Sequence, residues 1–305
     1  MTAPGSENQR WLVTGAGGFI GGRLLRTLRA RNLDAWGWTR ADCDLRVSEA
    51  VTRALAQLKP TQIVHLAASP GSAIKTDWTM VAEEVAMVGN LAEAMPEGCR
   101  LIHAGSMAEF GRSGRFDEGS ACRPRTPYGC AKAAATDHAV ALRFRLGRSI
   151  TVARLFGVYG PGEAPARLTP SLIRNLAAGL RVPLSPGDQV RDFVHVDDVC
   201  DILQGLALVD EAPPIVNVGT GVGLTVRTVC EAVADALGAD RDLLGFGEHP
   251  YRSVDEAELV ANTDLLARVV GVPVQRWLSF SQIADYVREE TVRLGVVHPA
   301  VDRSV

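Results

Sequence analysis

WLVTGAGGFIGGRLL, residues 11–25, places three glycines at a spacing of three between a short apolar run and a segment with helical apolar spacing. Gly15, Gly18 and Gly21 would lie where a buried strand turns into a helix. A tight turn, close approach of the backbone to a pyrophosphate, and close helix–strand packing each require a missing side chain. The helix N-terminus would then offer free N–H groups to an anion. An ordinary turn before a buried helix is the alternative, because one GxxGxxG motif is a weak signal.

Beyond this stretch, short apolar runs alternate with longer segments of helical spacing. Five runs are typical of strands in a parallel sheet covered on both faces. They are residues 10–15, 34–39, 62–68, 99–106 and 149–156. Between them, helical spacing occurs in residues 18–30, 48–58, 77–95 and 127–146, with Ser48 predicted as an N-cap. The alternation predicts right-handed βαβ units, and therefore an α/β fold with a doubly wound parallel sheet.

The rhythm changes after residue 157. Prolines interrupt the next stretch, at positions 161, 165, 170, 183 and 186. Residues 213–221, PPIVNVGTG, have the pattern of one more strand and turn. We therefore expect a smaller C-terminal part, built from segments that leave the main sheet and return to it.

Composition and charge restrict the class of protein. The chain has 305 residues, of which 47% are apolar and 22% charged, so it can bury a substantial core. A net charge of −3 gives no reason to expect nucleic acid or an anionic membrane as a partner. No stretch approaches the roughly 18 apolar residues of a membrane span, and the first ten residues lack the apolar region of a signal peptide. We expect a cytoplasmic protein.

The six cysteines show no pattern of metal ligation. They are widely spaced, without a CxxC pair or a cluster of histidines and cysteines at ligand spacing. We expect reduced thiols, mostly buried, and no metal site.

The end of the second predicted strand bears on the choice of dinucleotide. An acidic side chain there would accept from the ribose 2′-hydroxyl of NAD and repel a 2′-phosphate. The chain instead has Thr39 and Arg40, and a guanidinium offers a planar fork of donors to a phosphate. Arg40 therefore favours NADP. A solvated arginine at a strand end is the alternative, and Asp42 and Asp44 close behind keep NAD open.

A second group of residues suggests acid–base chemistry. Tyr128 and Lys132 stand four apart in a predicted helix, so both side chains point to one face. An ammonium beside a phenol favours the phenolate, which helps the phenol exchange its proton at working pH. Ser106 ends a predicted strand on the side where open α/β sheets bind ligands, and its hydroxyl could hold a carbonyl oxygen. A surface Tyr–Lys pair and a plain turn serine are the alternatives.

Six motifs follow in order, TGAGGFIG, VHLAAS, AGSMAEFG, PYGCAK, ARLFGVYGPGE and RDFVHVDDV. Together they resemble the extended short-chain dehydrogenase/reductase family, in its NAD(P)-dependent nucleotide-sugar epimerase/dehydratase/reductase branch. The resemblance implies an NADP-binding Rossmann domain over residues 1–157, with returning segments near 192–219. Residues 158–191 and 220–305 would form a substrate-binding domain.

The resemblance also implies roles for individual residues. The catalytic Ser-Tyr-Lys set of the family matches Ser106, Tyr128 and Lys132, and the last two also touch the cofactor in the family. Other positions match family residues that lie along the cofactor's phosphates, flank its adenine or run past the cofactor. These are Gly15, Gly18, Phe19, Ile20, Asp44, Leu45, Leu66, Ala67 and Ala68.

Buried scaffold roles are expected for His65 and His103, and a helix-capping arrangement for His195 and Asp198.

Arg191 and Arg252 match family positions that usually hold a nucleotide pyrophosphate. Two guanidiniums around a diphosphate make charge-assisted, often bidentate bonds. Arg191 would instead be part of the scaffold if it pairs with Asp192 or Asp197.

Two departures from the family concern the substrate side. Glu84 stands where the family commonly has asparagine, and Gly157 replaces the asparagine of RLFNVYG. A carbonyl substrate other than a sugar therefore stays open.

The sequence favours an NADPH-dependent reductase of a keto group, at C4, on a nucleotide-activated deoxysugar. An NAD-dependent epimerase and a non-catalytic NADP-binding regulatory protein are the alternatives. A dehydratase is disfavoured because SMAEFG lacks the Thr-Asp-Glu set of the dehydratases. The family often forms homodimers through the tyrosine helix and the helix at about 77–95, so a homodimer is expected.

Overall fold

Six parallel strands form the main sheet in a computed structural model that describes residues 9–69, 78–251, 256–271 and 281–295. They are β1 (Arg10–Thr14), β2 (Asp34–Trp38), β3 (Gln62–His65), β4 (Arg100–Ser106), β6 (Ser149–Leu155) and β10 (Ile215–Val218). The order is β10-β6-β4-β3-β1-β2, so the chain adds β2 on one side of β1 and β3 on the other. The strand order therefore reverses between β1 and β3, and open α/β sheets bind ligands at such a switch point.

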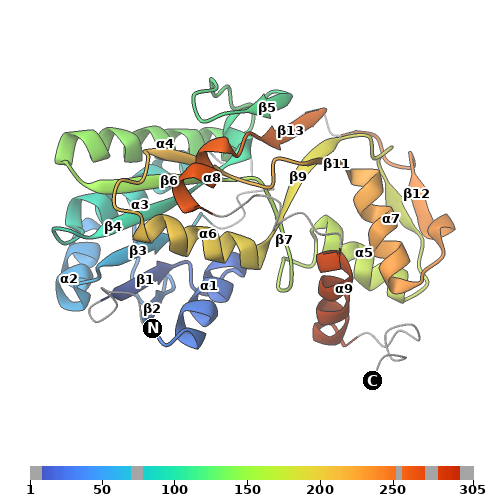
Figure 1. The fold of residues 1–305 in the computed structure, drawn as a ribbon, viewed down its shortest axis with the longest axis horizontal. Helices are drawn as coiled ribbons and strands as arrows, with labels where there is room; N and C mark the ends of the chain where they lie inside the picture. Colours follow the sequence, from blue (N-terminus) through green and yellow to red (C-terminus); the bar gives the residue numbers. More distant parts are fainter. Residues whose placement is uncertain (1–8, 70–77, 252–255, 272–280, 296–305) are drawn as a thin grey trace.

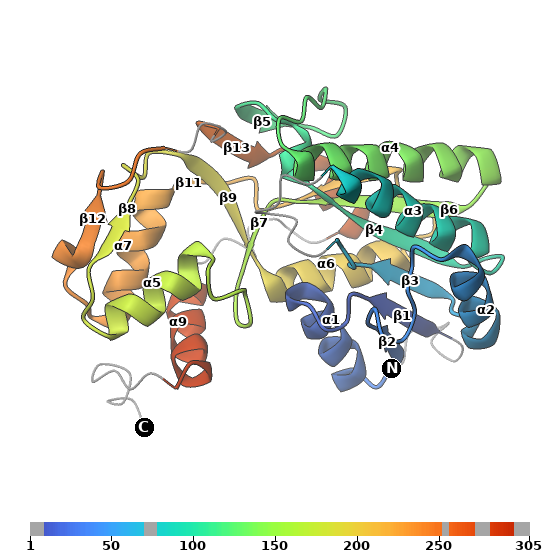
Figure 2. The same cartoon turned by 180° about the vertical axis from the view of Figure 1, so that it is seen from behind.

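Helices cover both faces of this sheet (Figure 1; Figure 2 shows the same from behind). One face is packed by α1 (Phe19–Ala30), α6 (Val196–Leu208) and α8 (Asp264–Val270). The other is packed by α2 (Ser48–Leu58), α3 (Thr79–Ala94) and α4 (Pro127–Leu146). In β1, Trp11 and Val13 enter the first core while Leu12 enters the second. The predicted doubly wound parallel sheet is confirmed, because apolar side chains on both strand faces have a helical layer to pack against.

The rest of the chain forms a second lobe, on the right in Figure 1. Its helices are α5 (Leu168–Ala177), α7 (Val226–Leu237) and α9 (Ser281–Arg293), and its core is formed by residues such as Leu172, Val233 and Val287. Two strands pair there, β8 (Val182–Leu184) and β12 (Leu244–Phe246). Between the lobes runs a sheet of β11 (Gly223–Thr225), β9 (Val190–His195), β13 (Glu258–Ala261) and β5 (Gly114–Phe116), with β7 (Gly157–Tyr159) beside β9. Short 3₁₀ turns occur at η2 (Met107–Glu109) and η3 (Arg241–Leu243).

Two sequence expectations need correction. Ser48 is the first helical residue of α2 and not its cap, because the carbonyl of Val47 already accepts from the amides of Ala50 and Val51. The predicted division at residue 220 also fails for α8. This helix buries Leu266 against the core under α6, so it packs on the larger lobe.

The cysteine prediction is confirmed: all six thiols are free, and Cys43, Cys99, Cys200 and Cys230 are buried. Burial raises the pKa of the Cys99 thiol to about 12. Among the helices within the described ranges, none is long and apolar enough to cross a membrane.

Candidate active site

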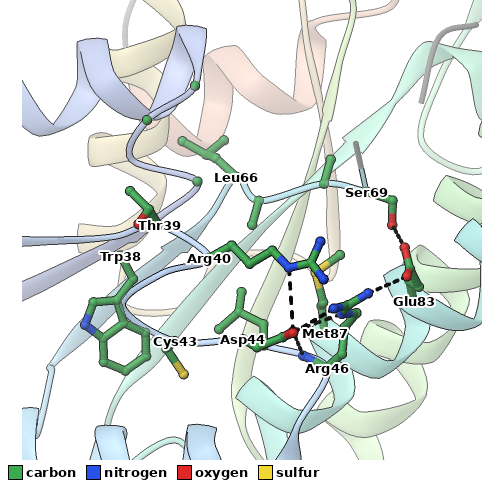
Figure 3. A pocket seen from close by; sticks show the side chains of 16 residues that line it. Trp38, Thr39, Arg40, Cys43, Asp44, Arg46, Leu66, Ser69, Glu83 and Met87 are labelled. Atoms are coloured by element: carbon green, nitrogen blue, oxygen red, sulfur yellow. Dashed lines mark hydrogen bonds and ion pairs between the residues drawn. The ribbon is translucent and has the colours of Figure 1, made fainter. Parts of the chain in front are cut away.

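A pocket of about 440 Å³ opens at the carboxyl ends of β1, β2 and β3 (Figure 3). Many of the residues that the sequence suggests for a cofactor line it together. These are Gly15, Gly18, Arg40, Asp44, Leu45, Leu66, Ala67 and Ala68. Phe19 and Ile20 begin α1 next to this pocket and pack, partly buried, on the core beneath.

The turn between β1 and α1 suits the phosphates of a dinucleotide. Gly15 has φ +67°, and a Cβ there would lie 2.7 Å from the backbone of Leu66 and Ala67. Within the described chain no side chain caps α1 at Gly18, and the first turn of the helix holds no acidic residue. The backbone can therefore come close to an anion, and the positive end of the helix dipole is left to attract it. On these observations the pocket fits NAD(P).

Around the end of β2, the acidic side chains are held by neighbours. Asp42 accepts from the amide of Thr39 at 2.8 Å and from its hydroxyl at 2.7 Å, so it closes its own turn. Asp44 accepts from Arg46 at 2.7 and 2.9 Å, and these bonds hold the pKa of the Asp44 carboxyl at about 2. The Arg40 side chain is 61% exposed, with its Nε 3.7 Å from Asp44. Arg40 is thus well placed to turn towards an anion in the pocket.

Several lining residues were not identified from the sequence. Arg46 is the most informative, because it binds Asp44 on one side and Glu83 of α3 at 2.6 Å on the other. Its position six residues after Arg40 could have marked it as a second guanidinium at this end of the pocket. The others include Trp38, Cys43, Ser69, Glu83 and Met87.

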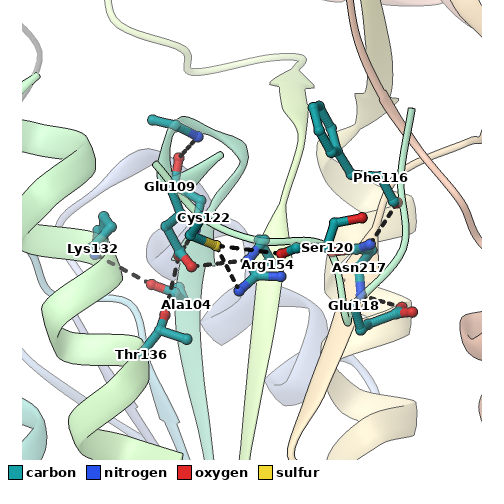
Figure 4. Close-up of polar contacts among 12 residues, drawn as sticks. Ala104, Glu109, Phe116, Glu118, Ser120, Cys122, Lys132, Thr136, Arg154 and Asn217 are labelled. Atoms are coloured by element: carbon teal, nitrogen blue, oxygen red, sulfur yellow. Dashed lines mark hydrogen bonds and ion pairs between the residues drawn. The ribbon is translucent and has the colours of Figure 1, made fainter. Parts of the chain in front are cut away.

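Ser106 ends β4, farther along the same carboxyl-terminal edge of the main sheet, and it is buried. Its hydroxyl accepts from the amide of Ala108 at 3.2 Å, and its own amide donates to Glu109 at 2.7 Å. The Glu109 carboxylate also accepts from Thr136 at 3.1 Å and from Arg154 at 2.9 Å (Figure 4). Glu109 therefore fixes the Ser106 turn from behind, by a charge pair buried within the protein.

Tyr128 and Lys132 approach the Ser106 turn from the start of α4. Gly129 makes this possible, because a Cβ at this position would lie 2.5 Å from the carbonyl oxygen of Ala108. Lys132 is buried, and its ammonium donates to the Glu84 carboxylate at 2.9 Å and to the carbonyl of Ala104 at 3.2 Å. The structure thus brings the Tyr128–Lys132 turn of α4 against the serine turn, with a buried carboxylate from α3 behind the lysine.

The histidines predicted as scaffold are buried. His65 and His103 stack with ring centroids 5.1 Å apart, and burial lowers the pKa of His65 to about 3, so it is uncharged at neutral pH. His195 caps α6, where its Nδ1 accepts from the amide of Asp197 at 3.3 Å.

On the substrate side, Arg191 lies in β9 and donates to the carbonyl of Val190 at 2.9 Å. Asp192 accepts from the hydroxyl of Thr220 at 2.6 Å, and Asp197 pairs with Arg23 at 2.5 Å. Arg252 lies outside the described residues.

The replacement of the family's asparagine by Gly157 has a steric reason. A Cβ on Gly157 would lie 2.6 Å from the carbonyl oxygen of Asp192, so the backbone of β9 occupies the place of a side chain.

Comparison with known proteins identifies the family. The model described as NAD dependent epimerase/dehydratase family matches residues 11–219. A dTDP-6-deoxy-L-talose 4-dehydrogenase (NAD(P)(+)) of Kitasatospora kifunensis is 30% identical over 267 residues, 80% of this chain and 84% of that protein. A dTDP-glucose 4,6-dehydratase of Xanthomonas campestris pv. campestris is 29% identical over 248 residues, 68% of this chain and 70% of that protein.

Solved structures agree. A dTDP-glucose 4,6-dehydratase from Streptomyces venezuelae, with NAD bound, matches with a TM-score of 0.81 and 25% identity, covering 96% of this chain and 100% of that one. The chain therefore belongs to the NAD-dependent epimerase/dehydratase family and is an NAD(P)-dependent oxidoreductase of the extended short-chain dehydrogenase/reductase type.

Proposed function

We propose that the protein uses NADPH to reduce a keto group, at C4, on a nucleotide-activated deoxysugar. The observation that carries this proposal is the arrangement of charges at the end of β2. Asp42 and Asp44 are held by Thr39 and Arg46, whereas the exposed Arg40 lines the pocket. A guanidinium in this position favours a ribose that carries a 2′-phosphate, and NADPH is the usual donor for reduction.

We call the part of the site formed by Ser106, Tyr128 and Lys132 the catalytic end, and these residues have complementary roles in this proposal. Ser106 and Tyr128 hold the substrate carbonyl oxygen by hydrogen bonds, and Tyr128 gives it a proton as the carbonyl is reduced. Lys132 orients the phenol and binds the nicotinamide ribose. NADPH, when bound, supplies the hydride. Arg191 and Arg252 hold the diphosphate of the substrate by charge-assisted bonds.

The segment after β4 supports reduction over dehydration. Elimination of water requires an acid and a base beside the sugar, in addition to the tyrosine. The chain has Met107 and Ala108 directly after Ser106, and the carboxylate of Glu109 is buried and bound to Arg154. The relative from Kitasatospora kifunensis is named a 4-dehydrogenase, and oxidation of a hydroxyl at C4 is the reverse of the reduction proposed here.

An NAD-dependent epimerase is the second candidate. The Asp44 carboxylate lines the same pocket as Arg40, and an acid at this end suits the free ribose hydroxyls of NAD. An epimerase regenerates its cofactor in each cycle and gains nothing by exchanging it.

The test is to mix purified protein with NADPH and a panel of 4-keto nucleotide sugars. We expect reduced-nicotinamide absorbance to fall in proportion to the product formed, and the purified protein to carry little NAD. Copurified NAD, with substrate converted to its epimer and no net change in absorbance, would assign the epimerase instead.

A further inference from the structure

The buried partner of the catalytic lysine is a residue that departs from the family pattern. Glu84 lies in the middle of α3, and its side chain is 2% exposed. One carboxylate oxygen accepts from Lys132 at 2.9 Å, and the other accepts from the amide of Ser69 at 2.7 Å. Burying a carboxylate is unfavourable by several kcal/mol unless donors of this kind surround it. The position is therefore built to hold a negative charge.

The other groups around Lys132 leave Glu84 as its counter-charge. Glu109 acts on Lys132 from η2, but it is already paired with Arg154 at 2.9 Å. His65 from β3 and His103 from β4 also interact with Lys132 electrostatically. Burial lowers the pKa of both histidines, so they are uncharged at neutral pH.

The pair keeps the lysine charged. Burial is the largest influence on Lys132 and by itself would lower its pKa, but the negative groups around it, Glu84 first among them, together outweigh burial, and the net shift is upward. Tyr128, one helical turn before Lys132, also interacts with it electrostatically. The ammonium one helical turn from Tyr128 is therefore paired with a carboxylate and is not an isolated positive charge.

We propose that Glu84 is a positioning residue that holds Lys132 and cancels most of its charge beside Tyr128. An unopposed ammonium would favour the phenolate, a base, which suits an enzyme that starts by oxidising its substrate. A paired ammonium leaves the phenol as an acid, which suits an enzyme that starts by reducing a carbonyl. This inference rests on the proposed function and gives it an electrostatic cause at the catalytic end.

The test follows tyrosine ionisation in the cofactor-free protein, by the near-ultraviolet absorbance of tyrosinate during a pH titration. The chain has four tyrosines. Burial raises the pKa of Tyr159 and of Tyr286, and desolvation with a bond to Asp188 raises that of Tyr251. The same titration of Tyr128→Phe identifies the Tyr128 signal by difference.

Two pairs of variants separate charge from shape. Glu84→Gln keeps the size of the side chain and removes its charge. Glu84→Asp and Glu84→Asn form a second pair of equal size, one methylene shorter, which serves if Glu84→Gln does not fold by circular dichroism. We expect the Tyr128 midpoint to fall by about one pH unit in each neutral variant, and to stay near that of the wild type in Glu84→Asp.

Glu83→Gln is the matched control. Glu83 is the neighbouring residue on α3 and also binds Ser69, but its cation is Arg46, not Lys132. Its removal should leave the Tyr128 midpoint unchanged. Neutral variants that titrate like the wild type, or a Glu83→Gln shift as large as that of Glu84→Gln, would overturn the proposal.

This experiment uses neither substrate nor cofactor, so it fails separately from the proposed function. A flat titration together with stoichiometric use of NADPH would refute the role of Glu84 and leave the reductase standing. A shifted titration together with epimerisation would uphold the charge pair and refute the reductase.

Discussion

The two ends of the candidate active site carry ion pairs in opposite surroundings. At the catalytic end, the side chains of Lys132 and Glu84 are 5% and 2% exposed, and those of Arg154 and Glu109 are 3% and 0% exposed. At the end of β2, Arg46 and Asp44 are about one-third exposed, and Arg40 is 61% exposed. One end is closed around its charges, and the other is open to solvent.

The difference in exposure separates ion pairs that fix a geometry from ion pairs that can change partners. A buried pair cannot lose one partner cheaply, because the remaining charge has no solvent to replace it. Such a pair fixes the residues around it in one arrangement. An exposed pair is screened by water and salt and contributes little to stability. Its members can exchange partners when an anion arrives, without disturbing the buried pairs at the other end.

The largest expected effect is on turnover, at the catalytic end. Tyr128→Phe removes the proton donor and keeps the ring, so turnover with the keto substrate should fall by roughly 10²- to 10⁴-fold. Binding of NADPH, measured by its fluorescence, should survive. Turnover close to that of the wild type would show that another group supplies the proton.

Glu109→Ala tests how much the buried ion pairs at the catalytic end contribute to the stability of the protein. The change leaves Arg154, the Ser106 amide and the Thr136 hydroxyl without their shared acceptor, so the free energy of unfolding should fall by about 3–5 kcal/mol. Urea denaturation measures this loss. As a control, Glu93→Ala breaks the exposed pair with Arg145 and should change it by less than about 1 kcal/mol. Equal losses for the two variants would contradict the comparison.

The smallest expected effect is on cofactor binding, at the exposed end of β2 around Arg40. Arg40→Ala should weaken NADPH binding by about tenfold, the low end for a charge-assisted bond, and leave NADH binding nearly unchanged. Isothermal titration with both cofactors measures the two affinities. Arg31→Ala removes an arginine at the far end of α1, where it pairs with Asp201, and should affect neither cofactor. If Arg40→Ala weakens both cofactors alike, Arg40 does not contact the phosphate.

Local patterns in the sequence were sufficient for the parallel sheet and for the glycine turn. Buried strands and amphipathic helices differ in the period of their apolar residues, and Gly15 stands where that period changes. The same order of strands and helices brought the predicted cofactor residues, from Gly15 to Ala68, to one edge, because parallel strands end on the same side.

Only the tertiary structure decided which charges meet. Lys132 and Glu84 are 48 residues apart, Arg154 and Glu109 are 45 apart, and Arg46 and Glu83 are 37 apart. Each contact depends on how α3, α4 and β6 pack across the sheet, and the period of apolar residues carries no information about a polar partner on another element. The sequence alone therefore determined the scaffold and the types of residue at the site, whereas packing decided that Lys132 has a buried carboxylate partner and that the acids near Arg40 accept hydrogen bonds from their neighbours.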